Sequence, residues 1–296
     1  DWRRLVEDPG LDAIAVAVPP QLQPEIVLAA LRRGKHVFCE KPLAAELQSA
    51  RELALAARKA GVANMVDFEL PALPAWRRLK GLLEGGALGR LRHAVVSWQV
   101  ETWASRRAQE SWKNDPARGG GVLNGFCSHL FYNVEWLLGP VDGLWARLFD
   151  TKGPARGRSD TLASLCLRLA SGAPVCASVC SSAPSGTGHR WELYGDRGCF
   201  VLENPTRDYA RGFRLSRRTG SAIRPASAPL RDRSKGPGGR PAAGRELVRA
   251  FLKWIRSGVP AAPTLDHGYR VQCLLDAARR SDASGRWVAA RGGRRP

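Results

Sequence analysis

The chain has 296 residues, 44% of them hydrophobic, which is enough to bury one large core or two medium ones. No stretch approaches the roughly 20 consecutive apolar residues of a membrane-spanning helix, so the sequence predicts neither a membrane protein nor a membrane partner. The formal net charge of +19 raises the question of an acidic partner such as nucleic acid.

Residues 1–69 alternate short apolar runs with amphipathic ones, a pattern typical of a doubly wound α/β unit. Gly34, Gly61 and the Pro9-Gly10 pair mark the ends of elements. The predicted elements are helices over 2–7, 24–33 and 43–60, and strands over 13–18, 34–39 and 62–68. We therefore predict three parallel strands with their covering helices.

A charged pair and a proline, Glu40-Lys41-Pro42, follow the second of these strands. The carboxyl ends of parallel strands open onto the ligand crevice, so this position would deliver Lys41 to a site of chemistry. A surface ion pair followed by a helix-starting proline is the alternative interpretation of these three residues.

The run DAIAVAVPPQLQPEIVLAALRRGKHVFCEKPLA, residues 12–44, resembles the Gfo/Idh/MocA family of nicotinamide-dependent oxidoreductases. The resemblance implies an NAD or NADP cofactor whose nicotinamide side is contacted by Pro19, Pro20, Gln23, Glu40, Lys41 and Pro42. Gln23 stands where the family has a histidine. The family's Gly-x-Gly-x-x-Gly phosphate cradle does not occur before residue 13, so we expect the Rossmann-like domain to be incomplete, with its first βαβ half missing.

Residues 70–296 have the pattern of an α+β domain with a large, mostly antiparallel sheet. The resemblance implies that this domain binds substrate and mediates oligomerisation. A long strand is predicted over 91–103 after a helix over 75–84. Shorter strands are predicted over 144–150, 161–170, 175–181, 191–195 and 199–203, and closing helices over 245–257 and 266–281.

A second chemical motif lies between Trp112 and His129 and contains three consecutive glycines. An apolar helix over 130–138 follows it, and Ser128 is the expected N-cap, which would place His129 in the first helical turn. There the positive end of the helix dipole would disfavour the imidazolium form. Taken alone, a histidine on an apolar helix is more often a core residue, and three glycines indicate a flexible loop.

This segment resembles the family pattern W-R-x-D-P-x-x-x-G-G-G-x-L-x-D-x-G-x-H. The resemblance implies that Lys41 and His129 are catalytic and that Trp112, Lys113, Asp115, Asn124 and His129 bind substrate. It also implies hydride transfer between the nicotinamide and a hydroxyl carbon of a sugar, cyclitol or related polyol. The family's aspartate four residues before the histidine is Gly125 here, which leaves a catalytically retired ligand sensor or regulatory protein as the alternative.

Residues 211–245 carry nine arginines and Lys235 against the single acid Asp232, and they predict a mobile basic loop. Phe213 is the only aromatic residue in this segment, so the stacking platform of a single-strand binder is missing and we expect no specific nucleic-acid partner. The expected partners are a small-molecule substrate and further copies of the chain, joined through the C-terminal sheet in a homo-oligomer.

Seven cysteines are scattered along the sequence without a Cys-x-x-Cys motif. Cys176 and Cys180 share a predicted strand, but no nearby histidine completes a set of metal ligands. We therefore predict reduced thiols, no metal site and a cytoplasmic location. No signal peptide is visible, but residue 1 already lies inside a domain, so the sequence leaves export open.

Overall fold

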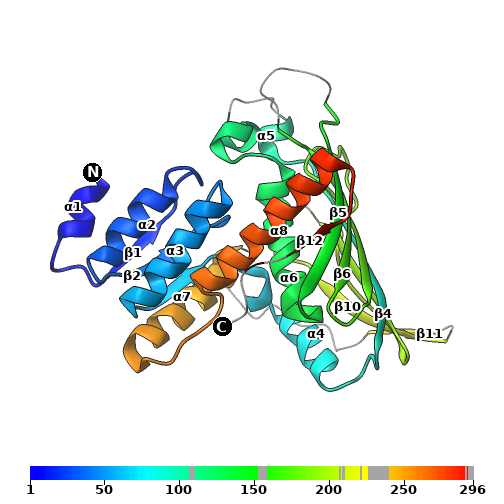
Figure 1. Cartoon of the computed structure of the whole chain (residues 1–296). Helices are drawn as coiled ribbons and strands as arrows, with labels where there is room; N and C mark the ends of the chain where they lie inside the picture. The colour runs from blue at the N-terminus through cyan, green and yellow to red at the C-terminus, as the bar shows by residue number, and fades with distance from the viewer. Residues whose placement is uncertain are drawn as a thin grey trace.

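The structure is a computed structural model that describes residues 1–106, 111–152, 159–206, 208, 211–220, 222–225, 240–290 and 292 (Figure 1). Its N-terminal part is a parallel sheet in the order β1-β2-β3. The elements are α1 (Trp2–Glu7), β1 (Ala13–Val16), α2 (Gln23–Arg32), β2 (His36–Cys39), α3 (Leu47–Ala60) and β3 (Asn64–Val66). All six predicted elements are confirmed, with shorter strands and a later start for α3.

The C-terminal part is built on a nine-stranded sheet in the order β11-β10-β9-β8-β4-β7-β6-β5-β12. Among the described strands of this large sheet only β4 and β7 pair in parallel, so the predicted mostly antiparallel sheet is confirmed. Its strands are β4 (Leu91–Gln99), β5 (Val141–Phe149), β6 (Leu162–Leu169), β7 (Pro174–Cys180), β8 (Gly188–Gly195), β9 (Gly198–Asn204), β10 (Arg214–Thr219), β11 (Ala222–Pro225) and β12 (Val288–Ala289).

Helices cover the face of this sheet that is turned toward the first domain (Figure 1). They are α4 (Pro74–Glu84), α6 (Ser128–Leu138) and α8 (Leu265–Ser284), with η1 (Leu70–Ala72) as the link from the first sheet. The core beneath them is rich in large aromatic side chains, and Trp76, Trp98 and Trp191 are almost completely buried. The alternation of buried and exposed residues along β4 produces this one-sided core.

Two C-terminal helices join the parts of the molecule. Phe251 of α7 (Arg240–Ser257) packs edge-on against Phe38 of β2, with ring centroids 5.7 Å apart. Helix α8 packs both on α3 and on β5. The two sheets are therefore connected through side-chain packing as well as through the chain.

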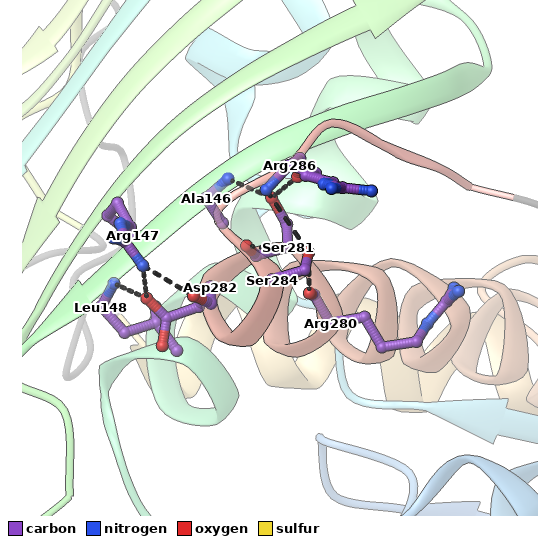
Figure 2. A network of polar contacts seen from close by, with 8 residues as sticks. All are labelled: Ala146, Arg147, Leu148, Arg280, Ser281, Asp282, Ser284 and Arg286. Carbon is purple, nitrogen blue, oxygen red and sulfur yellow. Dashed lines mark hydrogen bonds and ion pairs between the residues drawn. The ribbon is translucent and has the colours of Figure 1, made fainter.

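Polar side chains at the end of α8 satisfy backbone groups of β5 (Figure 2). Ser281 Oγ accepts a hydrogen bond from the Ala146 amide at 2.9 Å and donates one to the Arg286 carbonyl at 2.6 Å. Asp282 Oδ1 accepts from the Leu148 amide at 3.0 Å. Because β12 pairs with β5 only at residues 143–144, these contacts from α8 replace a neighbouring strand along the rest of that edge.

The structure corrects the prediction for the basic segment. Residues 214–219 and 222–225 form β10 and β11, and α7 begins at Arg240, so these parts are regular structure and not a mobile loop. A half-buried strand needs an apolar residue only at alternate positions. Here the apolar residues are Leu215, which is buried, and Phe213, which comes just before β10 and packs against Trp76. Residues 226–239, the rest of the predicted loop, lie outside the described residues.

Another correction concerns the end of β4. The strand ends at Gln99, and the last residue of the predicted 91–103 strand, Trp103, begins the short helix α5 (Trp103–Arg106). Within the described part of the chain, no helix is long and apolar enough to cross a membrane.

Candidate active site

A cavity of about 600 Å³ lies between the first sheet and the large sheet. Lys41 and Pro42, which follow β2, form one part of its wall. The remaining wall comes from β4 and the segment after it, from the 111–129 segment, and from residues beside the ends of β6 and β7. The cavity thus opens at the carboxyl end of a parallel strand, where ligands bind in open α/β sheets.

Gln23 fixes the backbone that carries Lys41. Its fully buried side chain donates from Nε2 to the carbonyl oxygens of Glu40, Pro42 and Leu43, at 2.7, 3.1 and 3.0 Å. Gln23 is absent from the cavity wall, so its observed contacts are with the loop and not with the space where a ligand binds. A buried amide that satisfies three carbonyls holds this turn in one conformation.

Lys41 crosses the boundary between the two parts of the molecule. Its Nζ donates to the carbonyl oxygen of Gly125 at 2.7 Å. Gly125 also lines the cavity, and a Cβ built on it would meet no atom within 4 Å. The position where the family pattern has an aspartate is therefore next to Lys41 and sterically open.

The glycine segment 119–121 packs too closely for larger residues. A Cβ at Gly120 would lie 2.5 Å from the Trp112 carbonyl oxygen, and one at Gly121 would lie 2.4 Å from Asp160 Oδ1. Gly121 also has a φ of +105°, a conformation that favours glycine. The three glycines therefore form a tightly packed loop in the cavity wall and not a flexible one.

Asp160 anchors this loop from the side of β6. Its Oδ2 accepts the Leu123 amide at 2.7 Å, and the carboxyl group lines the cavity. Burial raises the pKa of Asp160, although the hydrogen bond from Leu123 and the charge of Arg279 oppose the change.

His129 lies deeper in its helix than predicted. A single π-helical turn over Leu123–Cys127 runs directly into α6, and Ser128 has helical dihedral angles. Ser128 Oγ donates back to the Asn124 carbonyl at 2.7 Å and caps nothing. The predicted N-cap is wrong, because the π turn extends the helical segment upstream of Ser128. His129 therefore does not lie at the start of that segment, and the argument that the helix dipole disfavours its imidazolium form does not apply.

The imidazole of His129 is buried except where it lines the cavity. Its ring lies between Phe68 and Trp98, with centroid distances of 6.0 and 6.2 Å. Its Nδ1 lies 3.7 Å from Oε2 of Glu69, a carboxylate that is 1% exposed. The buried carboxylate of Glu69 thus lies next to His129, whose side chain lines the cavity.

Of the residues predicted from the sequence, Lys41, Pro42, Trp112, Lys113 and His129 meet at the cavity wall. Pro19, Pro20, Gln23, Glu40, Asp115 and Asn124 do not line it. Asp115 Oδ1 caps a 3-10 turn by accepting the Ala117 amide, and buried Asn124 bonds to the Gly119 carbonyl and to Arg279. We therefore expect Asp115 and Asn124 to shape the loop without touching substrate.

Glu69, Asp160, Trp98 and Trp103 were missed at the sequence level. Glu69 follows a strand of the first domain, and Asp160 precedes a strand of the second, so neither stands in a motif with His129 or the glycines. The available signal for Glu69 was its position just beyond the carboxyl end of β3, beside the acidic Asp67. Within the described residues, no three His, Cys, Asp or Glu side chains gather in a way that could hold a metal ion.

Comparison with known proteins identifies the fold and its chemistry. The profile described as the NAD-binding Rossmann fold of the oxidoreductase family matches residues 1–68, and that of the C-terminal alpha/beta domain matches residues 80–290. The chain belongs to the Gfo/Idh/MocA family of oxidoreductases. It is therefore an enzyme of the nicotinamide-dependent class, with NAD or NADP as its cofactor.

Individual relatives match along most of the chain. An uncharacterized oxidoreductase from Synechocystis sp., sll0816, is 31% identical over 299 residues, which is 96% of this chain and 81% of the relative. Levoglucosan dehydrogenase from Pseudarthrobacter phenanthrenivorans is 26% identical, over 97% of this chain and 82% of the relative. A solved levoglucosan dehydrogenase in complex with NADH and levoglucosan superposes with a TM-score of 0.86 at 26% identity, covering 98% of this chain and 83% of that one.

Proposed function

We propose that this Gfo/Idh/MocA enzyme exchanges hydride between its nicotinamide cofactor and a hydroxyl carbon of a ring sugar or cyclitol. The observation that supports this most is the meeting of Lys41 and His129 in one cavity, from two domains, beside the carboxyl end of β2. Levoglucosan dehydrogenase and a myo-inositol 2-dehydrogenase from Thermotoga maritima are among the relatives.

The cavity suits a ring polyol in size and lining. Trp98, Trp103 and Trp112 supply apolar ring surface, and Lys41, His129 and Asp160 supply polar groups around it. A site with an aromatic lining and a few placed polar groups is typical for a small ligand of this kind. The polar groups would orient the hydroxyls, and the indoles would cover the apolar face of the ring.

The residues at the ends of β1 and β2 fit the nicotinamide side of a cofactor. Pro19 and Pro20 follow β1, and Glu40 and Lys41 follow β2, so both turns stand at the carboxyl edge of the parallel sheet. Gly119 of the cavity loop packs close to Pro20, because a Cβ on the glycine would lie 3.1 Å from Pro20 Cβ. These turns would hold the cofactor, which supplies the hydride acceptor when bound.

In this mechanism Lys41 and His129 divide the work on the substrate hydroxyl. His129 accepts the hydroxyl proton as the carbon loses its hydride, and the ammonium of Lys41 stabilises the negative charge that develops on the same oxygen. The carbonyl of Gly125 keeps Lys41 in place between turnovers. Phe68 and Trp98 pack against the imidazole and restrain its orientation.

A panel of levoglucosan, D-xylose and myo-inositol, each offered with NAD and with NADP, together with the ketone 1,5-anhydro-D-fructose, offered with NADH and with NADPH, tests the proposed function. We expect reduction of the nicotinamide with at least one ring polyol, and loss of that activity in the His129→Ala enzyme. Binding of a sugar without any turnover would contradict the proposal and favour the sensor function.

We also propose that the chain self-associates through the outer face of the large sheet. The uncovered face carries Val95 and Phe149, which are 39% and 48% exposed. Light scattering should give a mass that is a multiple of the protomer's, and Val95→Arg should lower it. A monomer at micromolar concentration would contradict this.

The seven free cysteines support a proposed cytoplasmic location, where thiols stay reduced.

A further inference from the structure

We propose that Glu69 is the positioning residue of His129: its carboxylate holds the proton on Nδ1, so that Nε2 is the nitrogen that acts on the substrate. This inference rests on the proposed function. Glu69 Oε2 lies 3.7 Å from His129 Nδ1, and the two side chains are 1% and 6% exposed. Glu69 is absent from the cavity wall, so it acts through the histidine and not on substrate.

The surroundings keep the imidazole turned toward this carboxylate. Phe68 and Trp98 flank the imidazole, so the ring has little freedom to turn away from the acid. Charges attract more strongly in such an interior than in water. A carboxylate beside one ring nitrogen fixes which nitrogen carries the proton, and the other becomes the acceptor.

The two partners are held by separate elements. Glu69 precedes η1, and its backbone carbonyl accepts the Ala72 amide at 2.9 Å. His129 belongs to α6, and Tyr132, one turn further along, stacks on Phe68 with ring centroids 4.5 Å apart. The segment that leaves β3 and the helix of the second domain therefore pack as one unit behind the histidine.

Gly125 offers an independent way to test the role of a carboxylate. It lines the cavity on the turn before His129, and space for a side chain is open there. Gly125→Asp would place a second acid near Lys41 and His129. If Glu69 supplies the carboxylate that the site needs, this substitution should restore part of the activity that an isosteric change at Glu69 removes.

Steady-state kinetics on the full enzyme are the first measurement. Glu69→Gln keeps the shape of the side chain and should lower kcat on the order of 10²-fold, with KM for the sugar changed by less than about threefold. Glu69→Asp should retain more activity than Glu69→Gln, and Gly125→Asp should raise kcat of the Glu69→Gln enzyme. Unchanged kcat in Glu69→Gln would overturn the proposal.

Nitrogen NMR of the histidine rings gives a readout that needs no turnover. The chain has five histidines, and His129→Gln assigns the signal of interest. We expect the wild-type ring to carry its proton on Nδ1 and to shift toward the other tautomer in Glu69→Gln. A wild-type ring protonated on Nε2 alone would overturn the proposal even if Glu69→Gln failed to fold. An inactive wild-type enzyme with the expected tautomer would contradict only the proposed function.

A separate observation concerns two cysteines on the outer face of the large sheet. Cys166 of β6 lies directly opposite Cys176 of β7. In the same ladder, the Ser181 amide bonds to the Thr161 carbonyl and the Leu169 amide to that of Ala173. Because hydrogen-bonded and non-hydrogen-bonded pairs alternate, the cysteines form a non-hydrogen-bonded pair, whose Cα atoms are about 4.5 Å apart.

That separation falls within the range of roughly 4.4–6.8 Å that disulfides span. Burial, and then the neighbouring Cys176, raise the pKa of Cys166. Cys176 is exposed, whereas Cys166 is half-buried. In a single protomer Cys176 is therefore the thiol that a small oxidant meets first, and Cys166 is placed to react next. The self-association proposed above would cover this face, because Val95 lies beside Cys176, so the two cysteines react in protomers that have dissociated.

We infer that Cys166 and Cys176 form a reversible cross-strand disulfide when the protein meets a peroxide. The Cys176 thiolate would attack hydrogen peroxide to give a sulfenic acid and hydroxide, which a proton converts to water. The Cys166 sulfur would then attack the sulfenic sulfur, so that an S–S bond forms and a second water leaves. The two thiols are oxidised by two electrons, and a thiol reductant reverses the change.

Peroxide treatment of the intact protein, followed by alkylation and tryptic mass spectrometry, tests this inference. Arg168 lies between the two cysteines, so cleavage after it yields a linked pair of peptides when a disulfide joins them. Fragmentation of that pair places the bond on Cys176 and not on Cys180, which lies in the same peptide. We expect that pair to appear, to vanish with a thiol reductant and to be absent in Cys166→Ser, while fully buried Cys39 stays reduced. If both thiols remain alkylatable across a dilution series, or if Cys176 stops at a sulfinic acid, the inference is wrong.

Discussion

Single residues in this molecule act through partners that are distant in the chain. His189 is an example, since it stacks on Trp98 with ring centroids 4.0 Å apart and accepts the Trp191 indole N–H at 2.7 Å. Burial lowers the pKa of His189 to about 3. A neutral imidazole is therefore part of the support beneath the cavity wall, because Trp98 lines the cavity.

The lowered pKa of His189 predicts a pH-dependent stability. In the unfolded chain His189 binds a proton near pH 6.5, whereas in the folded protein it does so only near pH 3. The contribution of neutral His189 to the free energy of unfolding is therefore full above about pH 6.5 and is lost as pH falls toward 3. The free energy of unfolding should fall by about 1.4 kcal/mol per pH unit in this window from His189 alone.

His189→Gln is the matched control, because it offers Trp191 an acceptor but cannot titrate. Denaturant unfolding at about pH 6 and pH 4 should show a shallower loss of stability in the variant than in the wild type. Equal losses in the two proteins would mean that His189 is charged or exposed in the fold.

At the scale of elements, loops and helix ends set the shape of the site. The 119–121 loop touches the Trp112 and Lys113 carbonyls and the Asp160 carboxylate, so its shape depends on having no side chains. Gly120→Ala should displace the wall and lower kcat/KM on the order of 10²-fold. Gly81→Ala, in α4 with open space around it, is the control and should leave kinetics unchanged. Normal activity in Gly120→Ala would show that the loop adapts.

The contact between α8 and β5 gives a second prediction at this scale. Ser281→Ala leaves the buried Ala146 amide without its acceptor, which should cost about 1–3 kcal/mol of unfolding free energy. Ser284 is exposed: its hydroxyl donates to carbonyls of its own helix and accepts the exposed Arg286 amide at 3.3 Å. Ser284→Ala should therefore change stability by less than about 0.5 kcal/mol. Equal effects of the two substitutions would remove the special role assigned to Ser281.

The whole molecule shows which features a sequence can predict. The long helices, most of the strand residues between 91 and 204, and the presence of Lys41 and His129 at one cavity were predictable, because periodicity and local motifs encode them. The Glu69–His129 pair and the Asp160 contact with the glycine loop were not, since they depend on how two domains pack. Strand β10 was hidden by its arginines, and the Ser128 cap was contradicted by a π turn that no local pattern indicates.

The account as a whole depends on one site shared by two domains, in which Lys41 and His129 act on the same hydroxyl. The most direct measurement compares nicotinamide reduction by wild-type and Lys41→Ala enzymes, with the ring polyol that the panel identifies and with melting temperature as the control for folding. We predict that Lys41→Ala lowers kcat/KM on the order of 10²-fold or more while the melting temperature stays nearly the same. Activity within about threefold of wild type would contradict the assignment of Lys41 and, with it, the proposed mechanism.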